Sequence, residues 1–231
     1  MTVQKPRLDP MITSPDSNEY FNAISHLIGA ILSISALAVL VTLAVLAEQP
    51  THVVAFSIYG TSLLLSFVAS ALLHFFLLFG RYKRVFGILD HCAIYLLIAG
   101  SYTPFCLVVL GGPTGWTLFA IVWSLALFFI ALKAVFFANL PIWLSNGSFI
   151  MMGWVVIFFI TQVASNLGTT AVLLMGVAGL LYTIGAISFA FGRPNPFPPY
   201  FGNHEIWHLA VLLGNAVFFF VMLWYVLPYR G

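Results

Sequence analysis

Two histidines near the C-terminal end of the chain have a spacing that suits metal binding. His204 and His208 are four residues apart, so on a helix both imidazoles lie on one face, at a separation suited to a single zinc ion. No His, Asp, Glu or Cys follows His208. A third ligand must therefore come from another helix, and His74 is the best placed. Three histidines would leave a fourth position for water, as in a catalytic zinc site; metal-free packing is the alternative for the pair.

Asp90 and Ser70 could supply the remaining chemistry of such a site. Asp90 could accept a hydrogen bond from the water or act as its general base. Ser70 lies one turn before His74, so its hydroxyl could orient a ligand or bond to a developing oxyanion. The alternative for Ser70 is a small packing residue bonded to its own helix. For Asp90 it is an ion pair with one of three nearby bases, Arg81, Lys83 or Arg84.

Four further ionisable residues are candidates for supporting roles around the ligands. Glu19 and His26 are seven residues apart and so share a helix face, where they could hold the ligands in place or line a cytoplasmic mouth. For His91 the simpler interpretation is an interfacial or hydrogen-bonded histidine. Glu205 lies between the two C-terminal histidines.

The segment 204–208 reads HEIWH and also fits H-E-x-x-H, the metalloprotease pattern in which Glu is the general base. A protease of that kind usually takes its third ligand downstream of the motif, where this chain has no candidate. We therefore disfavour an intramembrane protease.

The composition indicates that the elements positioning these residues lie in a membrane. The chain is 62% hydrophobic and only 6% charged, whereas soluble domains carry roughly 25% charged residues. Apolar runs of about 20 residues, enough to cross a bilayer, recur along the chain. They predict an all-α bundle of seven transmembrane helices over 22–46, 52–79, 85–110, 115–137, 147–165, 169–191 and 204–227, as a domain of residues 18–231.

Residues 1–17 are polar and contain three prolines. They lack the apolar stretch and cleavage site of a signal peptide and are expected to form a retained cytoplasmic tail. Cys92 and Cys106 fall fourteen residues apart in one predicted helix, too far for a disulfide. A net charge of +2, carried by scattered residues, disfavours nucleic-acid binding.

The basic residues predict an orientation. Seven of the eight fall on one side of the predicted spans, which the positive-inside rule makes cytoplasmic together with the N-terminus. Only Arg230 lies opposite, in agreement with an odd number of spans and a C-terminus outside. The seven are Lys5, Arg7, Arg81, Lys83, Arg84, Lys133 and Arg193.

Placed on this topology, six polar residues from four helices reach one depth in the cytoplasmic leaflet, although the topology rests on other residues. They are Glu19, His26, His74, Asp90, His204 and His208. His52 falls on the opposite side and is not expected in the site.

Together these motifs resemble the hemolysin III branch of the progestin and adiponectin receptor family, within a superfamily that also includes alkaline ceramidases. The matching patterns are Glu19 with Asn22, Ser25 and His26; Ser70-x-x-x-His74; Asp90-His91; Tyr102-Thr103-Pro104; and His204-x-x-x-His208 after a proline-rich loop. The resemblance implies zinc held by His74, His204 and His208 near the cytoplasmic face, Asp90 contacting zinc through water, and Ser70 supporting the reacting centre.

Members of this family have been described as receptors, lipid amidases, membrane-fluidity factors and cytolysins. We expect a zinc-dependent hydrolase of lipid amides or esters, acting near the cytoplasmic leaflet in membrane lipid homeostasis. The alternatives are a non-enzymatic sensor of membrane state with structural zinc, and a channel-forming cytolysin. The bare seven-helix form resembles the bacterial members, so a membrane lipid is the expected substrate or ligand and a bacterial inner (plasma) membrane the expected location.

Overall fold

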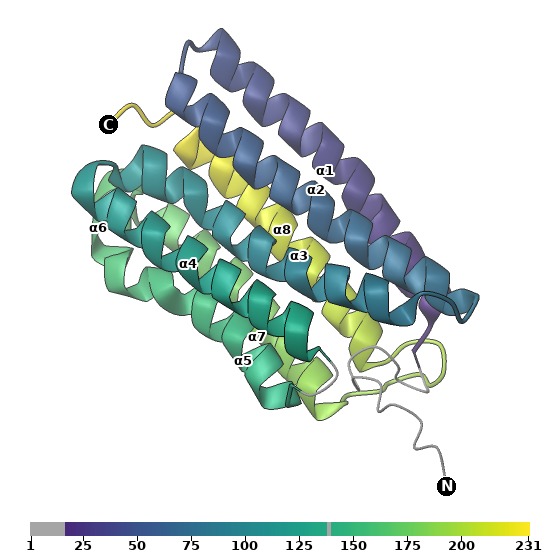
Figure 1. Cartoon of the computed structure of the whole chain (residues 1–231). Helices are drawn as coiled ribbons and strands as arrows, with labels where there is room; N and C mark the ends of the chain where they lie inside the picture. The colour runs from purple at the N-terminus through teal and green to yellow at the C-terminus, as the bar shows by residue number, and fades with distance from the viewer. Residues whose placement is uncertain (1–16, 138–139) are drawn as a thin grey trace, which may run out of the picture.

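A computed structural model describes residues 17–137 and 140–231 of the chain. The predicted tail of residues 1–17 therefore lies, except for Ser17, outside the described residues. Seven helical spans are long and apolar enough to cross a membrane, and they pack side by side as one elongated bundle (Figure 1).

The first four spans are nearly continuous helices. They are α1 (Glu19–Leu46), α2 (Pro50–Leu78), α3 (Lys83–Pro104), which continues as a π-helical stretch over Phe105–Leu110, and α4 (Gly112–Phe136). The fifth span is divided into α5 (Ile142–Trp154), a 3₁₀ stretch over Val155–Phe159, and α6 (Ile160–Leu167). The last two are α7 (Thr169–Phe191) and α8 (Asn203–Val221), the latter extended by a π-helical turn over Met222–Val226.

Local sequence signals account for several helix ends. The Asn18 side chain accepts a hydrogen bond from the Phe21 N–H and so caps α1. Pro50 occupies the first turn of α2, where its missing N–H costs nothing. Gly192 ends α7 with a positive φ of 64°, a left-handed conformation that glycine adopts without strain. The chain then enters the proline-rich loop that leads to α8.

The prediction of a seven-span membrane bundle is confirmed. The predicted ends agree with the structure to within about three residues, with one exception: the fifth helix begins at Ile142, five residues before the predicted start at Gly147. Its interruption at Val155–Phe159 was not predicted.

Tyr102 of α3 compensates for this interruption. Its hydroxyl lies 3.0 Å from the Met152 carbonyl oxygen and 2.7 Å from that of Gly153, and it accepts a hydrogen bond from the Val156 N–H at 2.9 Å. Backbone groups freed by a helix break must find protein partners inside a bilayer because lipid offers none. A single phenolic hydroxyl therefore bonds three backbone groups around the start of the break.

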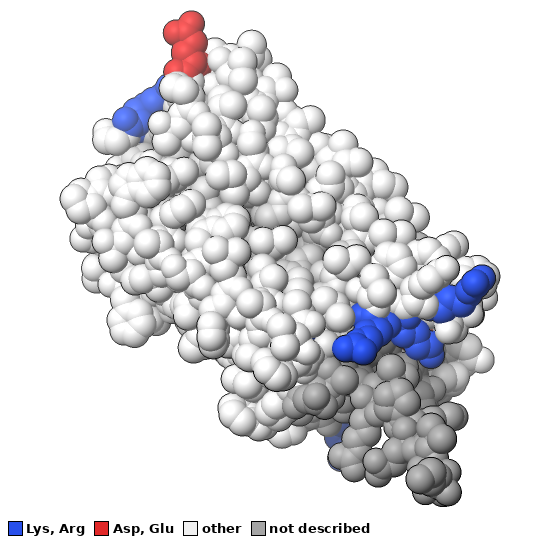
Figure 2. All heavy atoms as spheres, viewed as in Figure 1, with Lys and Arg blue, Asp and Glu red and all other residues white. Residues whose placement is uncertain are grey.

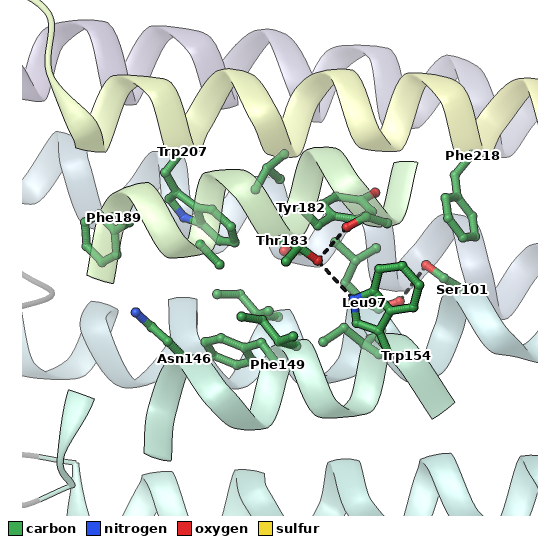
Figure 3. A pocket seen from close by; sticks show the side chains of 18 of the residues that line it. Leu97, Ser101, Asn146, Phe149, Trp154, Tyr182, Thr183, Phe189, Trp207 and Phe218 are labelled. Atoms are coloured by element: carbon green, nitrogen blue, oxygen red, sulfur yellow. Dashed lines mark hydrogen bonds between the residues drawn. The ribbon is translucent and has the colours of Figure 1, made fainter. Parts of the chain in front are cut away.

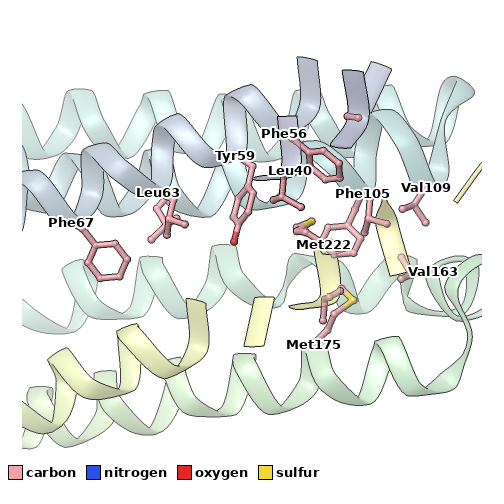
Figure 4. Packing of buried hydrophobic residues seen from close by; sticks show 14 of the residues in the cluster. Leu40, Phe56, Tyr59, Leu63, Phe67, Phe105, Val109, Val163, Met175 and Met222 are labelled. Carbon is pink, nitrogen blue, oxygen red and sulfur yellow. The ribbon is translucent and has the colours of Figure 1, made fainter. Parts of the chain in front are cut away.

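A cluster of buried apolar residues lies where α1 and α2 meet the π-helical stretches that follow α3 and α8, near the end of the bundle that carries the C-terminus. Leu40, Phe56, Tyr59, Phe105 and Met222 are fully or almost fully buried there (Figure 4). By contrast, many large apolar side chains on the outside of the bundle are exposed. In lipid these outward side chains face the solvent that they prefer.

Close helix contacts rely on small residues. A Cβ added to Gly100 of α3 would lie 1.9 Å from the Ser62 Oγ of α2. Such backbone proximity is typical of helix pairs in membranes, where small side chains let helices approach. The contact lies between the two helices that carry Ser70, His74 and Asp90.

Charged side chains gather at the two ends of the bundle (Figure 2). Arg81, Lys83 and Arg84 lie where α2 leads into α3, whereas Glu48 and Arg230 lie at the end where α1 leads into α2. The visible middle of the surface shows no charge, as expected for a surface that faces hydrocarbon.

Candidate metal centre and its cavity

Three histidines from two helices converge at one end of the bundle. His74 comes from the last turns of α2, and His204 and His208 come from the first turns of α8. One ring nitrogen of each lies within 4.8 Å of those of the other two, and all three side chains are buried. The predicted convergence is therefore present, and the cluster could hold a metal ion. Three imidazoles in a buried setting are a donor set that suits zinc.

Glu19 holds the first of these histidines in place. Its Oε2 lies 2.6 Å from the Nδ1 of His74, and the Ser17 hydroxyl donates to its other oxygen. A carboxylate bonded to one imidazole nitrogen fixes the tautomer and the ring orientation, which leaves Nε2 to face a metal. Glu19, which by its spacing was predicted to share a helix face with His26, is thus in direct contact with a candidate ligand.

His208 is held by two residues of α1. The Ser25 Oγ lies 3.3 Å from its Nδ1. The His26 ring stacks on its ring, with centroids 3.7 Å apart and planes 26° apart. His26 is 5% exposed, and neither of its ring nitrogens has a hydrogen-bond partner among the described residues. One face of α1 therefore supports the ligands from both α2 and α8.

Glu205 points away from the three histidines. Its Oε2 accepts a hydrogen bond from the Gly202 N–H at 2.7 Å, and its Oε1 accepts from the Asn18 N–H at 2.7 Å and the Asn22 Nδ2 at 3.1 Å. The fully buried carboxylate thus ties the start of α8 to the start of α1. An H-E-x-x-H protease needs this Glu free to act as a base, so the arrangement adds to the case against that interpretation.

Asp90 and Ser70 lie next to the triad, on the wall of a cavity. Asp90 of α3 is close enough to Ser70 and His74 of α2 to interact with both. In the described part of the chain no ion pair joins Asp90 to the bases considered as partners, Arg81, Lys83 and Arg84. Asp90 is therefore turned toward the candidate metal centre and not toward the surface.

The cavity runs from the triad into the bundle between α3, the fifth span, α7 and α8 (Figure 3). Its volume is about 300 Å³, and its walls are mainly apolar, with Leu97, Phe149, Trp154, Tyr182 and Phe218 among the lining residues. Trp154 is fixed by a 3.0 Å hydrogen bond from its indole N–H to the Thr183 hydroxyl. An apolar cavity with a few polar groups at one end is the usual form of a ligand site.

Two further residues, Asn146 and His91, line the cavity. The sequence did not single out the first, and no chemical role was expected of the second. Asn146 of α5 projects into the cavity (Figure 3). It was missed because it lies one residue before the predicted start of the fifth span at Gly147, whereas α5 begins at Ile142. His91, for which a plain hydrogen-bonded histidine was the simpler interpretation, also lines the cavity. Its Nδ1 has no hydrogen-bond partner among the described residues.

The side chain of Lys133 is buried inside the bundle. It was counted as a basic residue marking the end of the fourth helix, and it does lie in the last turn of α4. However, it is fully buried: its Nζ donates to the Ser145 Oγ at 3.0 Å and lies 5.0 Å from the centre of the Phe137 ring. The helix end was predicted correctly, whereas the burial of this side chain was not predicted.

Comparisons with known proteins agree with the motif pattern. Residues 16–219 match a family model described as "Haemolysin-III related". The chain is 47% identical over 210 residues to "Hemolysin-3" of Bacillus cereus, covering 91% of this chain and 92% of that protein. It is 42% identical over 207 residues to "Hemolysin-3 homolog" of Bacillus subtilis (strain 168), covering 90% and 93%.

Proposed function

The chain belongs to the haemolysin-III related family, and on that premise we propose that it is a zinc-dependent hydrolase of lipid amides or esters in a bacterial plasma membrane. The observation that carries the proposal is the buried triad of His74, His204 and His208, set beside Asp90 at the polar end of an apolar cavity.

The chain's own residues would hold the metal and its ligands in order. His74, His204 and His208 would bind zinc through one nitrogen each, while Glu19 and Ser25 fix the rings of the first and last. Zinc bound there would supply a Lewis acid that activates water and polarises a carbonyl group.

Asp90 would transfer the proton, and Ser70 would stabilise the negative charge that develops on the carbonyl oxygen. Asp90 takes a proton from the attacking water and returns it to the leaving amine or alcohol as the acyl bond breaks, so that the products are a fatty acid and the freed headgroup. The Ser70 hydroxyl donates to the carbonyl oxygen as negative charge develops on it. The position of both on one cavity wall supports these roles.

The apolar walls of the cavity suit the tail of such a lipid, which would enter laterally between helices. Burial of each methylene group contributes roughly 0.8 kcal/mol relative to water, although a tail taken from the bilayer gains far less. The walls therefore serve mainly to place the reacting carbonyl at the triad.

The charge pattern supports a cytoplasmic position for the site. The triad lies at the same end of the bundle as Arg81, Lys83 and Arg84, and the positive-inside rule assigns such an end to the cytoplasm. Seven spans then put the C-terminus outside. At this depth the site is level with the acyl linkages of the cytoplasmic leaflet.

The test begins with metal content and proceeds to turnover. Protein purified into lipid nanodiscs should contain about one zinc per chain, and His74→Ala and His208→Ala should each lose it. His52→Ala removes a buried histidine at the opposite end and should keep it. Wild-type protein should release fatty acid from palmitoyl amides, and Asp90→Asn should abolish release while keeping zinc. Zinc-free protein that cannot be reloaded, or release unchanged in Asp90→Asn, would overturn the proposal.

The names of the Bacillus relatives favour a second candidate, a cytolysin. The histidines and Asp90 that line the interior cavity gather at its triad end, and its other walls are mainly apolar, which argues against an ion-conducting pore through one chain. Pure protein in liposomes should therefore show no conductance. A conductance that persists in Asp90→Asn would favour the cytolysin. A protein that shows no turnover but becomes less stable when its zinc is removed would favour a sensor.

A further inference from the structure

A second polar cluster lies beside the triad, between α3, α4 and α5. It consists of His91, Lys133, Ser145 and Asn146. Lys133 donates to Ser145, and the Lys133 Nζ and the His91 ring both lie against Phe137, at 5.0 Å and 5.4 Å from its centre. None of these residues is needed to bind the metal in the proposed function.

The cluster places a positive charge inside the bundle. Lys133 is fully buried, and an ammonium at membrane depth costs several kcal/mol unless nearby groups compensate it. The hydroxyl of Ser145 and the ring of Phe137 supply part of this compensation. Lys133 is also close enough to interact electrostatically with His91 and Asp90. The field of the ammonium therefore reaches the cavity wall.

Two members of the cluster present hydrogen-bonding groups to the cavity. Asn146 is 5% exposed, and its Nδ2 has no partner among the described residues; Figure 3 shows its amide pointing into the cavity. His91 is 3% exposed, and its Nδ1 is also without a partner there. A buried donor without a partner destabilises the site, and a ligand oxygen that accepts its hydrogen bond removes this penalty.

The geometry points to a headgroup subsite in which Asn146 and His91 donate to an oxyanion, a carboxylate or phosphate, carried by the lipid in the cavity. Lys133 stands behind them and favours negative charge without touching the ligand. The inference rests on the proposed function only in placing a lipid there, since binding at this subsite requires no hydrolysis.

The subsite lies next to the reacting centre. His91 follows Asp90 in α3 and is close enough to His204 to interact with it. A lipid with its carbonyl at the triad would therefore place its next few headgroup atoms at Asn146 and His91. The preferred substrates are lipid amides whose headgroup carries an acid group within a few bonds of the amide.

The test compares two ligands that share a chain and an amide. N-palmitoylglycine carries a carboxylate, whereas N-palmitoylethanolamine carries a hydroxyl in its place. Binding to nanodisc-embedded protein is measured by competition with a fluorescent fatty amide. The wild-type protein should bind the carboxylate ligand about tenfold or more tightly than the hydroxyl ligand, since hydrogen bonds to charged groups are the stronger ones. A second pair of ligands, palmitoyl lysophosphatidate and monopalmitoylglycerol, makes the same comparison for a phosphate group in place of the carboxylate.

Substitutions at Asn146 separate this subsite from general packing. Asn146→Asp keeps the shape but replaces a donor by a negative charge, so it should reverse the preference while leaving the affinity for N-palmitoylethanolamine within about threefold. Asn146→Ala should reduce the preference to about threefold or less. Asn166→Ala is the matched control, because this asparagine donates to the Val109 carbonyl at the far end of the fifth span, and it should leave the preference unchanged.

The outcomes distinguish this inference from the proposed function. A charge preference that depends on Asn146 in a protein without turnover would keep the subsite and sink the hydrolase. Turnover by a protein that binds both ligands equally, or that keeps its preference in Asn146→Asp, would overturn the subsite alone.

Discussion

The Glu19 carboxylate of α1 lies 2.6 Å from the Nδ1 of His74 in α2, and this contact joins two helices at the candidate metal centre. It fixes the ring of a residue that also lies 4.7 Å, centre to centre, from the ring of His208 in α8. The first helix, which supplies none of the three candidate ligands, therefore controls how one of them presents its free nitrogen.

Replacing Glu19 by Gln should weaken zinc binding about 10- to 100-fold, because a carboxylate partner orients the imidazole and raises its basicity. Competition with a chromogenic chelator measures the affinity. Glu48→Gln, a change at the opposite end of the bundle, is the control and should leave the affinity unchanged. Equal affinities for the two variants would show that the contact does not support a metal.

His26 should act on zinc through the position of His208, on which it stacks. His26→Phe keeps a flat ring against His208 and should retain zinc affinity within about threefold, whereas His26→Ala should lose about tenfold or more. Zinc content after dialysis at graded chelator concentrations distinguishes them. If His26→Phe loses zinc as fully as His26→Ala, zinc affinity depends on a ring nitrogen of His26 and not on the stacking of its ring against His208.

Glu205 should matter for stability more than for chemistry. Glu205→Ala removes three hydrogen bonds to buried or half-buried donors and should lower the free energy of unfolding by roughly 3 kcal/mol or more, since each bond to a charged group contributes roughly 1.5–3 kcal/mol. Thermal unfolding in nanodiscs measures the effect. A protein that unfolds normally but loses all hydrolysis would instead revive the protease-type role of this residue.

The contact between Gly100 and Ser62 should be intolerant of added volume. Gly100→Ala places a methyl group 1.9 Å from the Ser62 hydroxyl oxygen and should destabilise the bundle by about 1–3 kcal/mol, as overpacking does. Ser62→Gly should restore much of this loss in the double variant. The four unfolding free energies form a double-mutant cycle, and strict additivity would refute the proposed close contact.

Much of the fold could be predicted from composition and spacing. Seven apolar runs predicted the spans, because a segment that crosses lipid must be long and must make its backbone hydrogen bonds within itself. The triad could be predicted because ionisable residues in lipid are few, so that His74 remained as partner for the two histidines of the last helix. Glu19 was placed near them by its depth alone.

The remaining features depend on contacts between helices that a single segment does not encode. The burial of Lys133 follows from the way α4 turns toward Ser145 of α5, and the direction of Glu205 follows from the approach of Asn18 and Asn22 across the bundle. The break in the fifth span depends on Tyr102, a residue about fifty positions earlier in the chain. Helix periodicity carries no information about such rotations.

The break also shapes the wall that the fifth span contributes to the cavity. Trp154, Val156 and Ile157 all line the cavity, and the Tyr102 hydroxyl bonds to the backbone beside them, at Met152, Gly153 and Val156. A continuous α-helix would turn these side chains by different amounts and so move this wall of the cavity. If the cavity holds an alkyl chain, as the proposed function requires, the Tyr102 hydroxyl helps to set the length of chain that fits. Substitution of Tyr102 then offers a way to alter chain-length selection without touching a candidate metal ligand.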